Sequence, residues 1–454
     1  SGGRKAMRHD SGCRGLRQPD FAGDDDSKAT GDAHNTFLAS YRSKTAFSII
    51  GCPAYPFAHQ QRRGNVAPAI VIEAVETMIL DVPTIRPHVL SVATMQSQAM
   101  VIVRLLCADG IEGLGEGTTI GGLSYGAESP ESIKLTIDQY IAPMISGMDA
   151  TRPAKVMAAL RKQIVANHFA KNAIEMALLD AQGQRLGIPV SELLGGRVRE
   201  RLPVLWTLAS GDTARDIEEA ETMLAARRHD AFKLKIGKRA LEADVAHVAA
   251  IKRALGDRAS VRVDVNQAWN ETTAKRGVAM LADAGVDLVE QPIKASNLAG
   301  MARLTAMGRI AVMADEALYG PETGHAYATA GAADVFAIKI AQAGGLAAAK
   351  ALGAVGDAAG IALYGGTMLE GGIGTVASAH LFATFGDLSF GTELFGPLLL
   401  TQEILAQPLD YAECSLGIPT GPGLGIRLNP DAVAQFRRDR PAPATISIPS
   451  LVNG

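Results

Sequence analysis

Charged residues recur at the ends of short apolar segments in the second half of the chain. The series is Lys233, Lys235, Asp264, Glu290, Asp315 and Lys339. From Lys235 onward, successive members are 24 to 29 residues apart, the length of about one strand, one helix and two loops. Each interval therefore predicts one β/α step that brings one charged side chain to the same end of a parallel sheet. In a closed (β/α)₈ barrel, that end carries the chemistry.

Three of these residues are carboxylates, and they predict a site for a divalent metal ion. Asp264, Glu290 and Asp315 each end an apolar segment. One such residue alone would ordinarily be a helix cap or a loop residue, but three in successive units would repel one another unless a cation held them. Oxygen ligands without Cys or His favour Mg²⁺ or Mn²⁺ over zinc. Glu316 can support the ligands, and Asn266 can orient a ligand or reach the substrate.

The lysines predict acid/base groups beside this metal. Lys233 and Lys235 are two apart in FKLKIG, so both point to one face of a strand. On a lone strand the pair would be a solvated edge, but parallel sheets are buried on both faces, and an inward lysine is costly unless it lines the open end. The two ammonium groups should lower each other's pKa, and a metal ion beside them should lower both. A lysine with a lowered pKa can transfer a proton near neutral pH.

Two further charged residues belong to the same end of the predicted sheet. Lys339 in FAIKIAQ should face Lys235 across the metal. Glu393 in SFGTELFG ends the eighth predicted strand, where its carboxyl group can hydrogen-bond a substrate oxygen or donate a proton.

Two other features can be interpreted in more than one way. The glycine-rich run over residues 364–380 lacks the G-K-[ST] of a phosphate loop. It is either a tight strand-to-helix turn or, in addition, a helix N-terminus that receives a substrate carboxylate. His88 follows the first predicted strand and belongs either to a lid or to a plain surface loop.

Eight apolar runs alternate with Ala-rich helical stretches and favour a barrel over an open sheet. The runs are LPVLWTLAS, FKLKIG, SVRVDVN, DLVEQP, IAVMADEA, VFAIKIAQ, IALYGG and SFGTE. Before them, a strand over residues 69–83 and a hairpin with a type I′ turn at Asp109-Gly110 precede helical stretches that reach about residue 186, which indicates an α+β domain. We expect an extension over residues 1–66, an α+β domain over 67–196, a barrel over 197–437 whose final segment returns to the first domain, and a tail over 438–454.

Composition excludes several classes of partner and compartment. The chain has 454 residues, a net charge of −3 and no dense basic patch interleaved with aromatics, so no nucleic-acid partner is expected. Its four cysteines form no C-x-x-C pair, which favours a reducing cytoplasm. No apolar run reaches about 18 residues, so no membrane span is predicted. The first 66 or so residues mix Gly, Ser, Arg, Asp and Pro without period, a composition typical of disorder.

Lysine, metal and lysine together suit the formation or protonation of an enolate. A divalent metal bound to a carboxylate takes up the charge that develops when the α proton leaves, and a positioned lysine moves that proton. Sites of the enolase superfamily combine a Lys or His base with metal in this way. The same groups can act in reverse and protonate an enolate that forms by addition to a double bond.

Residues 69–437 closely resemble the muconate-lactonizing subgroup of the enolase superfamily. The matching stretches are DVPTIRPH, GEGTTIGGLSYG, LLDAQGQRLG, FKLKIG, VRVDVNQAW, MADEA, FAIKIAQAGG, YGGTMLEG and GTELFGPLLL. The resemblance implies a modified (β/α)₇β barrel of the TIM type under an α+β capping domain. It implies that Asp264, Glu290 and Asp315 bind the metal, usually Mn²⁺. It also implies that Lys235 transfers the proton beside Lys233, with Lys339 opposite and Glu393 as a proton donor.

The implied activity is the interconversion of the small dicarboxylate cis,cis-muconate and muconolactone, in catechol degradation. The resemblance further implies a homo-oligomer, often an octamer. Chloromuconate-processing relatives differ at a few pocket positions, for which Ile120, Ala337 and Phe395 are the candidates here. N-acylamino acid racemases, dipeptide epimerases and o-succinylbenzoate synthases share the lysines and metal. A barrel that only binds a ligand should have lost one of the charged residues, and all of them are present.

Overall fold

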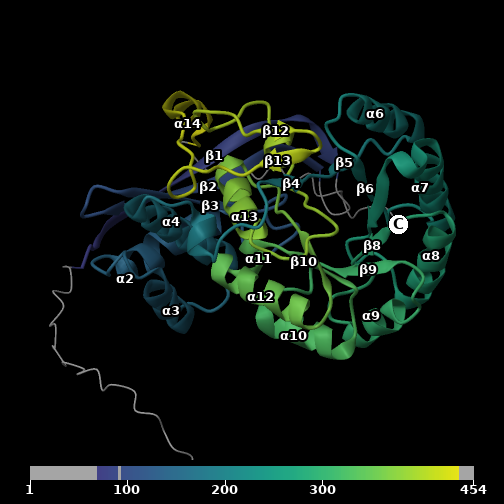
Figure 1. Ribbon diagram of the computed structural model, residues 1–454, viewed down its shortest axis with the longest axis horizontal. Helices are drawn as coiled ribbons and strands as arrows, with labels where there is room; N and C mark the ends of the chain where they lie inside the picture. The colour runs from purple at the N-terminus through teal and green to yellow at the C-terminus, as the bar shows by residue number, and fades with distance from the viewer. Residues whose placement is uncertain (1–68, 90–93, 439–454) are drawn as a thin grey trace, which may run out of the picture. The chain divides into compact units, whose positions relative to one another are not determined.

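The structure is a computed structural model that describes residues 69–89 and 94–438. The extension predicted over residues 1–66, and the predicted tail beyond Arg438, lie outside the described residues. Within them, an antiparallel sheet with its helices comes first in the chain, and a parallel barrel with outer helices follows (Figure 1). None of the described helices is long and apolar enough to cross a membrane.

The first sheet is a three-stranded antiparallel meander. Its strands are β1 (Ile72–Val89), β2 (Thr94–Cys107) and β3 (Glu112–Thr118). The hairpin between β2 and β3 confirms the predicted one, but the predicted turn type is wrong. Of the residues 108–110 in this turn, only Gly110 has a positive φ, at +78°. The Gly110 N–H donates to the carbonyl of Cys107. Ala108 and Asp109 therefore form a type I turn, and Gly110 supplies the left-handed residue that follows it.

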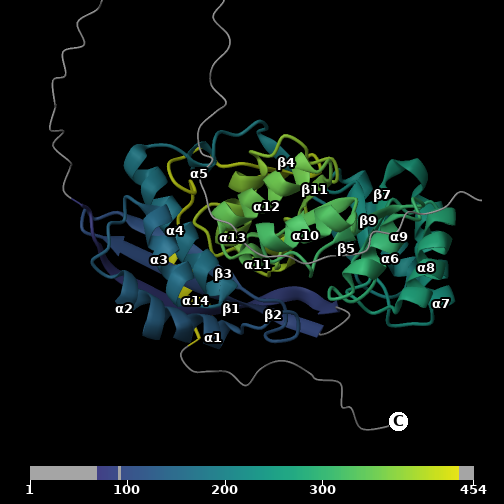
Figure 2. The same cartoon turned by 90° about the horizontal axis from the view of Figure 1, so that it is seen from below.

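Most of the helices that follow contact this sheet, whereas Pro153–Gln163 and Val190–Leu193 pack against the longest of them, His168–Leu186 (Figure 2). They are α1 (Pro130–Thr136), a π-helical turn (Ile137–Ile141), α2 (Ala142–Ile145), α3 (Pro153–Gln163), α4 (His168–Leu186) and α5 (Val190–Leu193). The helical stretch expected from about residue 152 to 186 breaks into α3 and α4, because Ala166 and Asn167 adopt left-handed backbone conformations.

Glycines on β3 allow α4 to approach the sheet closely. A Cβ atom at Gly113 or Gly115 would lie 2.0 Å from a carbonyl oxygen of α4, that of Ala177 or Ala173 respectively. The alternation of glycine along EGLGEGT therefore serves the contact between strand and helix. This contact fixes where β3 runs relative to the rest of the domain.

Seven parallel strands form the barrel sheet, in the spatial order β11-β10-β9-β8-β7-β6-β5. They are β5 (Trp206–Leu208), β6 (Ala231–Lys235), β7 (Ser260–Asp264), β8 (Leu288–Glu290), β9 (Ala311–Ala314), β10 (Val335–Ile338) and β11 (Ala362–Gly365). Thr392 occupies the eighth position, with parallel bridges to Val204 and to Gly365 that close the ring. The first predicted run, LPVLWTLAS, divides into β4 (Arg201–Pro203), which pairs outside the barrel, and β5.

Helices cover the outside of these strands (Figure 1). They are α6 (Thr213–Ala225), α7 (Leu241–Leu255), α8 (Glu271–Asp283), α9 (Leu298–Thr305), α10 (Pro321–Ala330), α11 (Ile340–Ala343), α12 (Leu346–Ala358) and α13 (Gly372–Phe382), with short 3₁₀ turns at Gly256–Arg258 and Gly396–Leu399. Asp212, Asn270 and Asn297 begin α6, α8 and α9, and each side chain accepts a hydrogen bond from a backbone N–H of the first turn. These caps mark where each loop ends and each helix begins.

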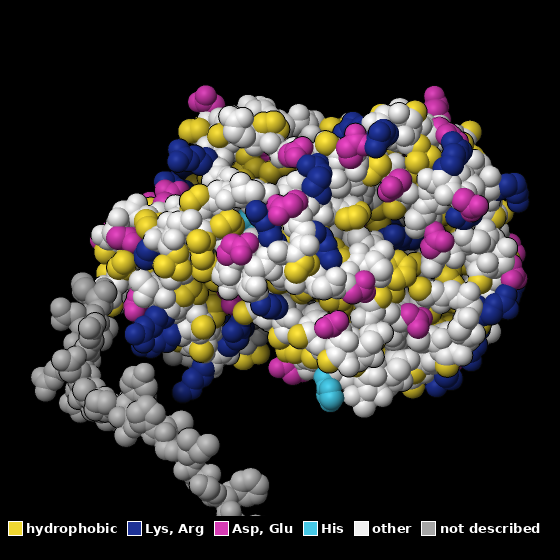
Figure 3. Space-filling model, in the orientation of Figure 1, with side chains coloured by type: hydrophobic (Ala, Val, Ile, Leu, Met, Phe, Trp, Pro, Cys, Tyr) yellow, Lys and Arg dark blue, Asp and Glu magenta, His cyan; other side chains and the backbone are white. Residues whose placement is uncertain are grey.

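The C-terminal segment returns to the first sheet. Strand β13 (Ser415–Gly417) pairs with β4 on one side and with β12 (Tyr411–Ala412) on the other, and α14 (Pro430–Phe436) follows. Arg437 then bridges to Leu80 of β1. Lysine, arginine, aspartate and glutamate side chains are interspersed over the face in Figure 3, in keeping with a net charge of −3.

Candidate active site

The register of the barrel strands brings the predicted charged residues together at one end. Lys235 is paired with Asp264 between β6 and β7, and Asp264 is paired with Glu290 between β7 and β8. Asp315 and Lys339 are the first residues after β9 and β10, and Glu393 follows the closing residue Thr392. Because the strands are parallel, every one of these side chains lies at the carboxyl end of the barrel.

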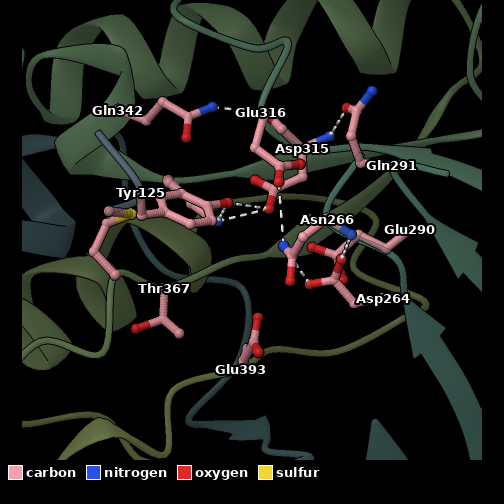
Figure 4. Close-up of polar contacts among 12 residues, drawn as sticks. Tyr125, Asp264, Asn266, Glu290, Gln291, Asp315, Glu316, Gln342, Thr367 and Glu393 are labelled. Atoms are coloured by element: carbon pink, nitrogen blue, oxygen red, sulfur yellow. Dashed lines mark hydrogen bonds and ion pairs between the residues drawn. The ribbon is translucent and has the colours of Figure 1, made fainter. Parts of the chain in front are cut away.

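Asp264, Glu290 and Asp315 form a buried acidic triad that fits a divalent metal ion. Each offers a carboxylate oxygen, and these three atoms lie within 4.8 Å of one another. Figure 4 shows the three carboxylates converging, and one oxygen of Asp315, Oδ1, has no hydrogen-bond partner although it is buried. Burial, followed by the neighbouring Asp264, raises the pKa of Glu290 well above its usual value. A cation would relieve both the repulsion and the unpaired oxygen.

Lysines stand on both sides of this triad. Lys235 forms an ion pair with Asp264 at one side, and the Lys339 Nζ lies 2.7 Å from the Asp315 Oδ2 at the other. Lys233 lies deeper, with its Nζ 3.0 Å from the Glu290 Oε2 and 2.5 Å from the Glu393 Oε1. The structure thus places Lys235 and Lys339 on opposite sides of the carboxylates, as the spacing predicted.

The protein's own charges shift the pKa of Lys233 in the direction opposite to the one expected beside a metal ion. Burial alone would lower the pKa of Lys233, but the carboxylates of Glu290 and Glu393 outweigh it and hold this pKa well above its usual range. The predicted depression assumed a bound cation; with the protein's own charges alone the direction for Lys233 is upward, because carboxylates rather than ammonium groups are its nearest neighbours. Burial opposes ionisation of Asp315, yet the ammonium of Lys339 lowers the pKa of this carboxyl to about 2.

Asn266 lies beside the triad and contacts two carboxylates. Its amide Nδ2 lies 3.1 Å from the Asp264 Oδ2 and 3.1 Å from the Glu316 Oε1. Asn266 therefore orients Asp264, one of the two roles considered for it. Burial and the nearby Asp315 raise the pKa of Glu316 to about 8. The carboxyl group of Glu316 supports the site through Asn266.

Two residues from the first domain complete the site, and sequence reasoning did not assign them. The Tyr125 hydroxyl donates to the Asp315 Oδ2 at 2.6 Å and accepts from the Lys339 Nζ at 2.8 Å (Figure 4). His88 lies near the end of β1, where it is buried and lines the pocket. It therefore does not belong to a plain surface loop, one of the two places considered for it. Burial and the charge of Lys235 lower the pKa of His88 to about 3, which keeps the imidazole neutral.

These side chains line a pocket with about 300 Å³ of space that is not filled by protein atoms, part of which is open to solvent. Ile120 and Phe395 line it as predicted, whereas Ala337 is buried in β10 and is not among the lining residues. The remaining lining residues are Thr207, Thr367 and Leu369. Thr207 gave no signal of function in the sequence. Thr367 and Leu369 belong to the glycine-rich run over residues 364–380, which was singled out, but neither residue was assigned to the pocket.

The glycine-rich run follows β11 as a tight strand-to-helix connection, but its helix start is closed to a substrate. The Glu116 carboxylate of β3 accepts hydrogen bonds from the backbone N–H groups of Gly371 and Gly374, at 2.7 and 2.8 Å. The expectation that this helix N-terminus receives a substrate carboxylate is therefore wrong, because a carboxylate of the protein already occupies it.

The fold and the site define an α/β-barrel protein whose buried acidic triad is flanked by lysines under an α+β cap. A family model described as "Mandelate racemase / muconate lactonizing enzyme, N-terminal domain" matches residues 74–195, and one described as "Enolase C-terminal domain-like" matches residues 215–432. The chain belongs to the mandelate racemase/muconate lactonizing enzyme family of the enolase superfamily.

Individual relatives resemble this chain over nearly their whole length. The chain is 60% identical over 383 residues to muconate cycloisomerase 1-2 of Acinetobacter lwoffii, which covers 84% of this chain and 100% of the relative. It is 59% identical to the muconate lactonizing enzyme of Pseudomonas fluorescens solved in complex with muconolactone, with a TM-score of 0.81 over 82% of this chain and 100% of that one. A chloromuconate cycloisomerase of Cupriavidus necator is 43% identical over 81% of this chain and 99% of the relative.

Proposed function

We propose that this protein is an enzyme that converts cis,cis-muconate into muconolactone with the help of a divalent metal. The observation that supports this most strongly is the 60% identity to a muconate cycloisomerase, in a chain that places three lysines around the Asp264, Glu290 and Asp315 triad. The similarity to muconate cycloisomerases exceeds the similarity to the chloromuconate relative, which favours the unchlorinated substrate.

The charge balance of the pocket explains why a metal is required. Lys233, Lys235 and Lys339 face four carboxylates, those of the triad and of Glu393, which leaves one excess negative charge. A dicarboxylate would be repelled from such a site. A bound Mn²⁺ or Mg²⁺ turns the balance positive and stabilises negative charge that develops on the substrate carboxylate. Mn²⁺ is the metal that we propose.

The residues then divide the reaction between them. One carboxylate oxygen of muconate adds to the double bond that is conjugated with the other carboxylate, and the electron pair of that double bond moves toward this second carboxylate to give an enolate. Lys235 donates a proton from its Nζ to the α carbon, and the lactone remains. Two carboxylates become one, so each turnover consumes one proton, which solvent returns to Lys235. Lys339 stabilises the charge from the opposite side.

Glu393 lies at the closed side of this arrangement. Its Oε1 is 2.5 Å from the Lys233 Nζ, and its Oε2 is 3.4 Å from the Tyr364 hydroxyl. We assign Glu393 and Lys233 to holding the substrate and supplying a hydrogen bond to its oxygen atoms. Ile120 and Phe395 then set the shape of the pocket, with Ala337 and Asn266 behind it. The proposal includes a cytoplasmic location, which rests on the cysteine usage, and a homo-oligomer that acts in catechol degradation, which rests on the family resemblance.

Proton NMR of the product in D₂O tests this proposal. The Mn²⁺-loaded protein should convert cis,cis-muconate into muconolactone with one deuterium at the protonated carbon. Lys235→Ala should yield none. If the wild-type protein leaves muconate unchanged, the assignment fails, and the racemase and synthase substrates of the same subgroup are the next to test.

A further inference from the structure

One wall of the pocket is formed by a loop whose backbone is held from outside the pocket. The loop, residues 367–371, follows β11 and contributes Thr367 and Leu369 to the lining. Leu369 has φ = +59°, a left-handed conformation that costs energy for a residue with a branched, bulky side chain. Such a conformation persists only where the surroundings determine it.

Side chains of the first domain help to hold Leu369 in this left-handed conformation. The Gln98 amide of β2 is 2% exposed, and its Nε2 donates to the carbonyl oxygens of Leu369, at 2.8 Å, and of Met368, at 3.3 Å. Glu116 of β3, 1% exposed, binds the N–H groups of Gly371 and Gly374 at the end of the loop. Neither Gln98 nor Glu116 lines the pocket.

The loop satisfies its remaining polar groups internally. The Leu369 N–H donates to the Thr367 Oγ1 at 2.9 Å, and the Met368 N–H donates to the Glu370 carboxylate at 2.9 Å. A Cβ at Gly396 would lie 2.1 Å from the carbonyl oxygen of Glu370, so the loop is also packed tightly from the barrel side. Only Gln98 binds the carbonyl of the left-handed residue itself, among the side-chain hydrogen bonds of the described residues.

We propose that Gln98, assisted by Glu116, is a positioning residue that holds Leu369 in its left-handed conformation and thereby sets the substrate-facing wall. The cap thus determines substrate binding through a residue that never touches the substrate. This inference rests on the proposed function for its kinetic readout. It deepens that function by assigning a determinant of substrate affinity to the contact between β2 and the loop after β11.

A double-mutant cycle tests the inference with the Mn²⁺-loaded full chain and muconate. Because Leu369 lines the pocket and is not placed among the proton-transfer groups, its displacement should raise KM more than it lowers kcat. Gln98→Leu removes the amide at similar size, and it should raise KM by about tenfold, the effect of one lost buried hydrogen bond. In a Leu369→Gly background, where a positive φ costs nothing, the same change should raise KM by less than about twofold.

Two controls separate this role from a loss of structure. Gln163→Leu changes an exposed glutamine of α3 and should leave KM and kcat unchanged. If Gln98→Leu does not fold, Gln98→Met provides the same loss of the amide with a flexible side chain. A folded Gln98 variant with normal KM, or an equal rise in KM with and without Leu369→Gly, would overturn the inference.

A crystal structure of the Gln98→Leu variant gives a readout that does not depend on the reaction. We expect Leu369 to leave the positive-φ region or to occupy two conformations. An unchanged Leu369 would contradict the inference whether or not muconate is the substrate. Wild-type protein that is inactive on muconate would instead contradict the proposed function and leave this structural result to decide the inference.

Discussion

Lys235 and Asp264 lie directly opposite each other in the register between β6 and β7, and their side chains form an ion pair. The group proposed to move the proton therefore contacts a residue proposed to bind the metal. Strand pairing alone produces this contact, because both residues end their strands at the same level of the barrel. The two side chains nevertheless have separable roles, which single substitutions can distinguish.

Lys235→Ala should abolish proton transfer and leave the metal site. General acid–base groups contribute about 10²–10⁴-fold, so kcat for muconate should fall by about 10³-fold or more. Thermal stability and Mn²⁺ affinity should stay close to those of the wild type. Lys162→Ala, at an exposed position of α3, is the matched control. A Lys235→Ala enzyme with near-normal kcat would remove Lys235 from the proton-transfer role.

Asp264→Asn should weaken metal binding. The amide keeps the shape of the side chain but removes one of three negative charges that surround the metal. We expect the Mn²⁺ dissociation constant, measured by isothermal titration calorimetry, to rise by more than about tenfold. Asp257→Asn, at an exposed turn after α7, should leave it unchanged. Unaltered affinity in Asp264→Asn would exclude this carboxylate from the ligand set.

The convergence of the three carboxylates could be predicted from sequence because its signal is local and repeated. Asp264, Glu290 and Asp315 each end an apolar strand, and parallel strands necessarily bring such ends together. Tyr125 and Gln98 gave no comparable signal, since each acts on the barrel only through the packing of the first domain. The Asp109-Gly110 dipeptide predicted the position of the hairpin but not its turn type. With Leu106 paired to Glu112, the connection is a type I turn followed by Gly110.

His380 should make stability depend on pH. It is buried in α13, and its Nε2 is 3.1 Å from the Leu424 carbonyl. Burial, with Arg197 nearby, lowers its pKa to about 4 from 6.5, against the hydrogen bond to Leu424 and the charge of Glu192, which both raise it. The unfolded chain binds this proton below about pH 6.5 and the folded chain does not, so stability falls as pH drops from 6.5 toward 4, by up to about 3 kcal/mol.

The difference in Tm between pH 7.5 and pH 5 checks this. In His380→Gln the imidazole titration is absent, so this difference should shrink relative to wild type, even if the variant is less stable at both pH values. His325→Gln, at an exposed position of α10, should keep the wild-type difference. An undiminished difference in His380→Gln would show that other groups carry the pH dependence.

Gly115→Ala should destabilise the contact between β3 and α4. The added Cβ would lie 2.0 Å from the Ala173 carbonyl oxygen, and neither backbone can move freely. We expect a loss of about 2 kcal/mol or more in the free energy of unfolding, in line with overpacking of a tight core. At Gly386 a Cβ would meet nothing within 4 Å, so Gly386→Ala should change stability by less than about 0.5 kcal/mol. Equal effects of the two substitutions would contradict the role assigned to the β3 glycines.

The most direct test of the central claim is the loss of muconate absorbance in the ultraviolet, with purified protein and Mn²⁺. The same assay is repeated after chelation and with 3-chloromuconate. We predict rapid loss with muconate, little loss after chelation, recovery when Mn²⁺ is restored, and slower turnover of the chlorinated substrate. No loss with muconate under any of these conditions would contradict the proposed function, and faster loss with 3-chloromuconate would move the protein to the chloromuconate branch.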